Sequence, residues 1–370
     1  MIAFIIFQTD PLNTLYSAGT YFAYANDSWK FIANTLDPVN PPYPYHLVAT
    51  SLHFLLPYSI ISLLLPPNIA LYLSILLIQY LAALFTVFLL YNFLFDCFEL
   101  KRNECLALII AFEFLFMSPF LILASSEILF LFYQILAWTF FYHRRYLLAA
   151  IAASMTFALR FNGAFFVIGL LLVYIGKWWK EKDLDWTQIF KIGISIVSMF
   201  LIGFSSFIQS WVVYNDFWVP LTYQNVVYRR FLGIKANDIF GIPFFWWLDY
   251  VYWILSSSSI FELAYFILGV LTFGLGLFSV YKLIKWSQIE KLEYQYHLTI
   301  IFLCSFLGIN FLTSVSNYAR FQSTTFPLFP VFPLLFQDHN FSSLNLKLIS
   351  IGSIMVGLLF NTIWWLTYII

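Results

Sequence analysis

The chain has 370 residues, of which 62% are hydrophobic, 22% aromatic and only 10% charged, whereas soluble domains are roughly half apolar and about a quarter charged. This composition excludes an ordinary soluble enzyme and predicts an all-α membrane protein with several spans. The formal net charge is zero, so charge gives no support for a nucleic-acid partner.

The first 66 residues predict a non-cytoplasmic loop over 8–66 that follows a short apolar opening. Prolines are dense between Asp37 and Pro44, and they favour turns and extended backbone over helix. The apolar stretch after them contains Pro57 and ends at Pro66, which predicts two short interfacial or re-entrant helices. The opening itself lacks the basic flank and the cleavage site of a signal peptide.

Ten apolar runs follow and predict a single membrane domain, 1–370, with about 9–12 transmembrane helices. Several runs are shorter than the ~17 residues that an upright span needs. A loop over 214–258 is rich in Trp and Tyr, which is typical of the headgroup level. The runs cover 69–97, 105–123, 128–142, 146–159, 163–177, 192–213, 259–282, 297–314, 324–337 and 348–370.

The loops between these runs differ in positive charge, which predicts the orientation. The more basic set of loops faces the cytoplasm in membrane proteins. One set carries twelve lysines and arginines and the other carries six. The six are Lys30, Arg160, Arg229, Arg230, Lys235 and Arg320, so the polar candidates below lie at the non-cytoplasmic face.

Two polar patches interrupt apolar sequence and predict a working site. Ser126 and Glu127 form the first patch, and Arg160 and Asn162 form the second. Ionisable side chains in such sequence usually face a watery cavity or one another. Arginine also snorkels at helix ends, but its planar fork is suited to gripping a phosphate.

Further candidates lie in the predicted non-cytoplasmic loops. Asp27 is either a general base or a helix N-cap, and Asp10 is the second candidate for the base. Arg320 would give an anionic headgroup a second clamp beside Arg160, and Gln224 lies in the long loop. No phosphate loop, HExxH, CxxC or GxSxG motif is present. No metal ligand set and no cofactor are therefore predicted, and His53 is interpreted as an interfacial polar residue.

Three short motifs resemble those of the PIG-V family of GPI mannosyltransferases and its prokaryotic relatives. Ser126–Phe130 is similar to the family's Ser-Glu-x-Leu-Phe, and Arg160–Gly163 to its Arg-Ser-Asn-Gly with Phe in place of Ser. Arg320–Pro327 resembles its Arg-Phe motif with the following Pro. The family's Trp-Asp pattern is represented by Asp27 without the Trp, and its aromatic-proline segment only by Tyr43–Tyr45.

The resemblance implies a GT-C type, inverting glycosyltransferase. It would move mannose or a similar hexose from a dolichyl- or polyprenyl-phosphate donor to a glycolipid or glycan acceptor, as in GPI-anchor-like glycolipid biosynthesis. Asp27 or Asp10 would be the catalytic base, and Ser126, Glu127, Arg160, Asn162, Gln224 and Arg320 would bind the donor phosphate or substrate. Membrane lipid and a small membrane subunit are the other expected partners.

Two alternatives stay open at this point. A lipid or sugar transporter or flippase would place polar residues along a path, but it predicts inverted repeats with paired broken helices, and no repeat is found in the sequence. A scaffold without activity would be distinguished by an Asp27→Ala variant. The short loops and the lack of an evident retrieval tail favour a prokaryotic cell membrane slightly over the endoplasmic reticulum membrane.

Overall fold

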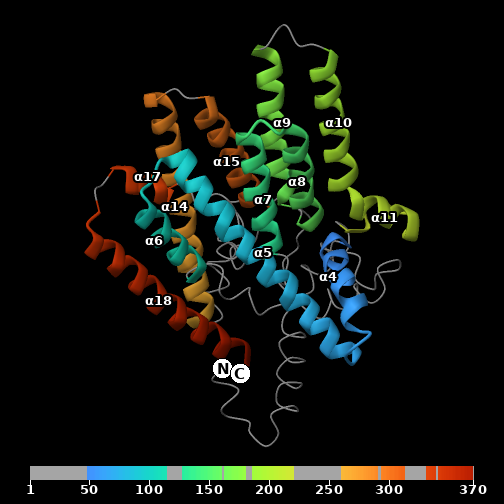
Figure 1. The fold of residues 1–370 in the computed structure, drawn as a ribbon, viewed down its shortest axis with the longest axis horizontal. Helices are drawn as coiled ribbons and strands as arrows, with labels where there is room; N and C mark the ends of the chain where they lie inside the picture. The colour runs from blue at the N-terminus through green and yellow to red at the C-terminus, as the bar shows by residue number, and fades with distance from the viewer. Residues whose placement is uncertain are drawn as a thin grey trace, which may run out of the picture.

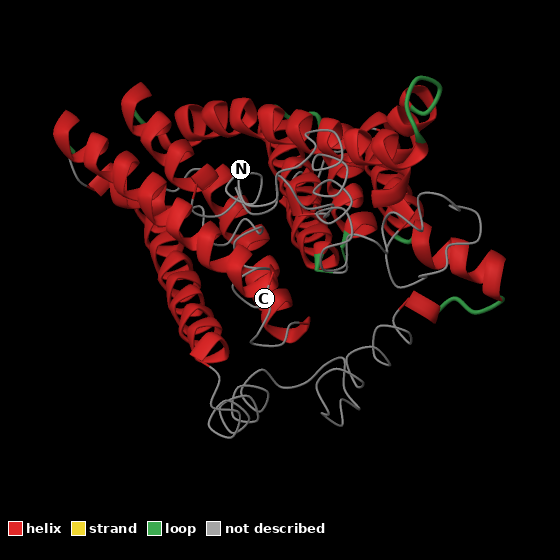
Figure 2. Cartoon of the chain, turned by 90° about the horizontal axis from the view of Figure 1, so that it is seen from below, coloured by secondary structure: helices red, strands yellow, loops and turns green. Residues whose placement is uncertain are grey.

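The computed structural model describes residues 48–114, 127–160, 162–180, 186–220, 260–290, 293–312, 331–338 and 341–369. Within these ranges the chain forms α-helices and short loops without any strand (Figure 2), so the predicted all-α class is confirmed. Most of the predicted loop over 8–66 and nearly all of the loop over 214–258 lie outside the described residues.

The described helices follow the predicted apolar runs closely. The run 146–159 coincides with one helix because an arginine flanks it on each side. The helices are α4 (Val48–Ile61), α5 (Pro67–Phe98), α6 (Arg102–Phe112), α7 (Glu127–Tyr142), α8 (Tyr146–Leu159), α9 (Gly163–Lys180), α10 (Trp186–Gly203), α11 (Ser205–Tyr214), α14 (Ile260–Glu290), α15 (Glu293–Leu312), α17 (Val331–Asp338) and α18 (Ser343–Ile369).

The stretch predicted to hold two short helices forms one described helix, α4, so this prediction was wrong. The helix continues through Pro57, although a proline inside a helix removes one backbone hydrogen bond. It ends in a turn before Pro66, and Pro67 then occupies the first position of α5, where a missing N–H costs nothing.

The apolar run over 192–213 is bent by 51° between α10 and α11. The bend falls beside α8, where the ring of Phe157 packs edge-on against Phe204 with centroids 4.9 Å apart. A side chain at Gly203 would collide with the Phe157 ring. The glycine therefore lets the end of α10 approach α8, and the chain turns away after it.

Helix α8 is the centre of the bundle and packs against α4, α7, α9 and α10. Figure 1 shows it between α7 and α10. Four alanines, Ala149, Ala150, Ala152 and Ala153, are buried along it. Small side chains let helix backbones approach closely, and this packing holds apolar helices together where water does not drive them.

Helices α9 and α15 also pack closely, through a glycine on each. Gly169 of α9 lies against the backbone of Ile301, and Gly308 of α15 lies against the ring of Phe165. A side chain at either glycine would collide with the partner helix. The two contacts join α9 to a helix that comes much later in the chain.

Several helix ends meet at one end of the bundle, which we call the basic end. The Tyr142 hydroxyl donates to the Asp96 carbonyl (3.3 Å), and the Tyr294 hydroxyl donates to the Cys97 carbonyl (3.4 Å). These bonds bring the ends of α5 and α7 to the start of α15. The basic end is defined by Lys101, Arg102, Arg144, Arg145, Lys177, Lys282 and Lys285, all from the loops or helix ends predicted to be cytoplasmic.

The surface of the bundle is strongly apolar, while polar side chains lie inside. Leu64, Phe88 and Val212 are 83%, 61% and 76% exposed, whereas Gln79 and Thr86 are fully buried. Among the described residues, α5 contains one candidate membrane span, Ile69–Phe98, and the bent pair α10–α11 meets the same criterion when counted as one.

Candidate functional site

The two polar patches predicted from the sequence meet as a buried ion pair. Arg160 Nη1 lies 2.6 Å from Glu127 Oε1. The Glu127 side chain is fully buried and that of Arg160 is 11% exposed. The expectation that charged groups in apolar sequence face one another is therefore confirmed for this pair.

The pair follows from the geometry of the α7–α8 hairpin. Glu127 is the first residue of α7, and Arg160 caps the end of α8. The two helices have 16 and 14 residues and are joined by a tight turn, so the start of one lies beside the end of the other. A carboxylate at a helix N-terminus is stabilised by the helix dipole by about 0.3–1 kcal/mol.

The backbone at Arg160 directs its side chain toward Glu127. Its N–H still donates to the Thr156 carbonyl (3.0 Å), but its φ and ψ of −152° and 140° are extended. The next helix begins three residues later, after the Gly163 N–H donates to the Arg160 carbonyl (2.9 Å). Arg160 thus lies at the corner between α8 and α9.

Gly163 is the residue that permits this corner. A Cβ at this position would overlap the backbone of Thr156 in the last turn of α8. Because backbone atoms cannot move aside, only glycine lets α9 start so close to α8. The motif Arg160–Gly163 therefore positions the arginine and forms the turn with the same four residues.

Asn162 lies in the same corner and is 8% exposed. Its carbonyl accepts the Phe165 N–H (3.2 Å) in the first turn of α9. Its Nδ2 makes no hydrogen bond within the part of the chain that the structure describes. A buried amide donor next to the ion pair can serve an anionic or hydroxyl ligand, because unpaired buried donors are costly.

The corner places one positive and one negative charge beside an aromatic ring. The Arg160 Cζ lies 6.0 Å from the centre of the Phe130 ring, which is fully buried. Removing two charges from water costs several kcal/mol for each ion, which is offset only by close pairing. A guanidinium has five donors on a planar fork, so it can contact a carboxylate on one edge and a phosphate on another.

The other predicted site residues cannot be placed relative to this corner. Ser126, Asp10, Asp27, Gln224 and Arg320 lie outside the described residues. Their roles stay predictions from the sequence.

The structure shows a polar pair between α4 and α7 that the sequence did not predict. The ring of His53 on α4 makes a 2.8 Å hydrogen bond with the Tyr133 hydroxyl on α7. The rings are nearly perpendicular, with centroids 5.6 Å apart. The two residues are far apart in the sequence, and a hydrophobic pattern predicts which faces are buried but not which helices are neighbours.

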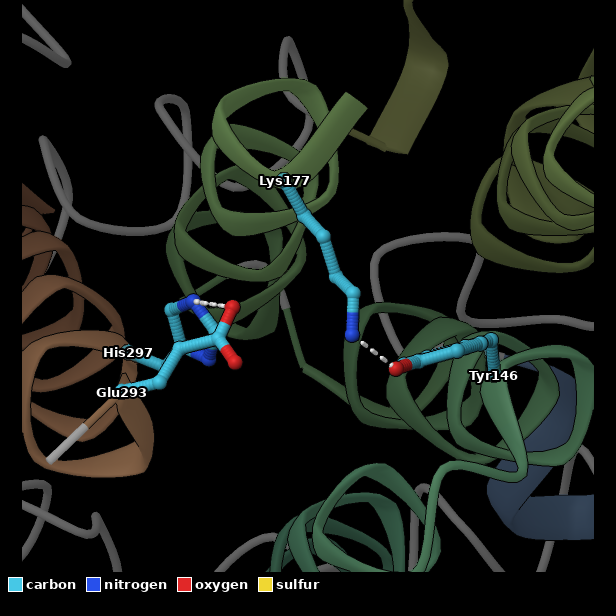
Figure 3. Close-up of polar contacts among 4 residues, drawn as sticks. All are labelled: Tyr146, Lys177, Glu293 and His297. Atoms are coloured by element: carbon cyan, nitrogen blue, oxygen red, sulfur yellow. Dashed lines mark hydrogen bonds and ion pairs between the residues drawn. The ribbon is translucent and has the colours of Figure 1, made fainter. Parts of the chain in front are cut away.

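A second group of polar contacts lies at the basic end (Figure 3). The Lys177 ammonium donates a short hydrogen bond to the Tyr146 hydroxyl and lies 4.9 Å from the centre of that ring. The Tyr174 hydroxyl donates to the Tyr146 carbonyl (2.7 Å). On α15, His297 Nε2 lies 3.7 Å from Glu293 Oε1. The lysine and tyrosine contacts join the start of α8 to the end of α9.

The described residues contain no group of three or more His, Cys, Asp or Glu side chains that could hold a metal ion. Comparisons with family models, with curated proteins and with solved structures give no match to this chain.

Proposed function

We propose that this chain is a multi-pass membrane glycosyltransferase. It moves mannose or a similar hexose from a dolichyl- or polyprenyl-phosphate donor to a glycolipid or glycan acceptor at the non-cytoplasmic face, with inversion. A prokaryotic cell membrane is its expected location.

The distribution of apolar side chains supports the membrane setting. On α11 the exposed residues are Trp211, Val212 and Tyr214, whereas Ser206 and Ser210 are buried. Phe207 on the same helix is also buried, so the inner face is mixed while the outer face is apolar. A water-soluble helix exposes polar side chains instead. Exposed apolar faces of this kind indicate contact with lipid.

The Glu127–Arg160 pair is the observation that carries the proposed activity. It lies at the end of the bundle opposite the basic end, because α7 ends and α8 begins at the basic end. A guanidinium that is nearly buried, and whose partner is fixed at a helix start, is ready to bind a lipid-linked phosphate without further ordering.

The proposed reaction is a single displacement. The acceptor hydroxyl oxygen attacks the anomeric carbon while a carboxylate, for which Asp27 is the prediction, takes the hydroxyl proton. The new C–O bond forms as the bond from the anomeric carbon to the phosphate oxygen breaks, and its electron pair leaves with the lipid phosphate. Arg160 stabilises that phosphate, and Asn162, two residues later in the chain, is a further donor in the proposal.

The test is transfer from radiolabelled polyprenyl-phosphate-mannose to mixed glycolipid acceptors in membranes that contain the protein. Arg160→Gln should lower transfer by at least about 100-fold, as expected for removal of a group that stabilises the leaving charge. Arg145→Gln is the matched control, because Arg145 caps the opposite end of the same helix. Equal transfer by the two variants would overturn the role of Arg160, and no transfer of any sugar by the wild-type protein would overturn the enzyme.

A transporter or flippase is the second candidate, and the 51° bend between α10 and α11 favours it. Broken helices with polar interiors line substrate paths in transporters. Movement of a labelled lipid-linked sugar across the bilayer of proteoliposomes, without transfer to any acceptor, would support this candidate over the first.

A further inference from the structure

The hydrogen-bonded pair of His53 and Tyr133 joins α4 to α7. Tyr133 is on α7, the helix that begins with Glu127, and His53 reaches it from α4. Both side chains are partly exposed, unlike Glu127 and Phe130, which are fully buried. The histidine and tyrosine are therefore not sealed inside the bundle.

Helix geometry relates the two polar pairs. Glu127, Phe130 and Tyr133 are three residues apart, so they form one ridge on α7 that shifts by roughly 60° at each step. Arg160 binds the first residue of the ridge and lies over the second. The Tyr133–His53 pair follows at the third, about 9 Å along the helix axis from Glu127.

The two pairs differ in charge, and this difference indicates what each binds. Arg160 is a permanent cation and suits a phosphate. A tyrosine hydroxyl and a neutral imidazole both donate and accept, which suits the hydroxyl groups of a sugar. Charged and neutral recognition groups one after the other along a ridge match a sugar phosphate, in which hydroxyls follow the anionic group.

We propose that Tyr133 and His53 bind the sugar of the lipid-linked donor whose phosphate lies at Arg160. This rests on the proposed function and assigns the sugar-contacting residues, for which no sequence motif accounts. The hydrogen bond between the two rings holds the tyrosine hydroxyl in place before the sugar arrives.

The test compares two probes on the purified full chain in lipid nanodiscs: a short polyprenyl phosphate and the same lipid phosphate esterified with mannose. Wild-type protein should bind the mannosyl lipid more tightly than the plain phosphate. Tyr133→Phe should weaken binding of the mannosyl lipid by about fivefold, as for one lost hydrogen bond, and leave binding of the plain phosphate unchanged.

Tyr142→Phe is the matched control, because it removes a hydroxyl from the other end of α7, where it bonds to the Asp96 carbonyl. It should change neither affinity. The assignment is overturned if Tyr133→Phe weakens both probes equally or neither, or if the wild type shows no preference for the mannosyl lipid. Failure of the wild type to bind even the plain phosphate would overturn the proposed function as well, so the two failures are distinguishable.

Discussion

Arg160 illustrates how a single residue can be fixed by two constraints of different kinds. Its backbone ends α8 and leads into α9 through a corner that only Gly163 permits, and its side chain pairs with a carboxylate at the start of α7. The first constraint is steric and the second electrostatic. Substitutions can therefore separate them.

Removing either charge of the pair should destabilise the protein. Glu127→Gln or Arg160→Gln leaves the other charge buried and uncompensated, which costs about 3–5 kcal/mol of unfolding free energy. The double variant should lose less than the sum of the single losses, because no charge is left behind. Denaturant unfolding in detergent micelles measures all four proteins, and strict additivity would contradict a direct pairing.

Gly163→Ala should also destabilise the protein, for the steric reason. The added methyl group would collide with the Thr156 backbone, and overpacking of this kind costs about 1–3 kcal/mol. Gly176→Ala in the same helix is the control, since no described atom lies within 4 Å of its added Cβ. That control variant should be more stable than the wild type by about 0.5–1 kcal/mol, because alanine has the higher helix propensity. Thermal unfolding shows whether each variant is less or more stable than the wild type.

At the residue scale, sequence reasoning predicted the participants of the ion pair but not the second polar pair. Glu127 and Arg160 stand out because each interrupts an apolar run, and a short hairpin must bring its two ends together. His53 and Tyr133 carry no comparable signal. Their contact depends on how α4 lies against α7, which packing decides.

At the scale of elements, the α7–α8 hairpin determines where the ion pair forms. Its turn contains Arg144 in the left-handed region, with φ of 59°. The Arg145 N–H donates to the Phe140 carbonyl (2.8 Å) and closes the turn. A non-glycine residue in this conformation costs about 1–2 kcal/mol.

Arg144→Gly should therefore stabilise the hairpin, by up to about 1 kcal/mol, because glycine adopts a positive φ without a steric cost. Arg145→Gly removes the same charge from the neighbouring position, where φ is −89° and glycine relieves no steric cost. This variant should not stabilise the hairpin. Thermal unfolding of both variants tests this. A gain for Arg145→Gly of the same size would indicate that relief of positive charge is responsible and not the backbone.

The helix elements were predictable from apolar runs, while their interruptions were not. The flanking arginines mark both ends of α8 in the sequence. Neither Pro57 within α4 nor the bend after Gly203 could be placed in the same way. In both cases the packing of neighbouring helices overrides the local preference. An apolar run in the sequence therefore predicts the length of a helix but not where the helix breaks or bends.

For the whole molecule, the gathering of cationic helix ends at one end of the bundle predicts the orientation in a bilayer. Positive loops remain in the cytoplasm of membrane proteins, so we expect the Glu127–Arg160 end to face the other side. Among the described residues, Lys101, Arg102, Arg144, Arg145, Lys282 and Lys285 lie in loops or helix ends on the basic side. The number of spans stays a prediction.

Cysteine labelling in intact cells tests this orientation. In a background without Cys97, Cys105 and Cys304, an Asp216→Cys variant should react with a membrane-impermeant maleimide, because Asp216 follows α11 and is exposed. An Arg145→Cys variant, exposed at the basic end, should react only after the cells are opened. Labelling of both positions from the same side would contradict the proposed topology.

The close contact between α9 and α15 has a consequence for biogenesis. Gly169 and Gly308 need one another's helix, yet α9 ends at Lys180 and α15 begins at Glu293. At the usual pace of translation, α9 waits on the order of ten seconds before its partner leaves the ribosome. During that interval the close contact at Gly169 is not yet formed, so α9 packs fully only after α15 has been synthesised.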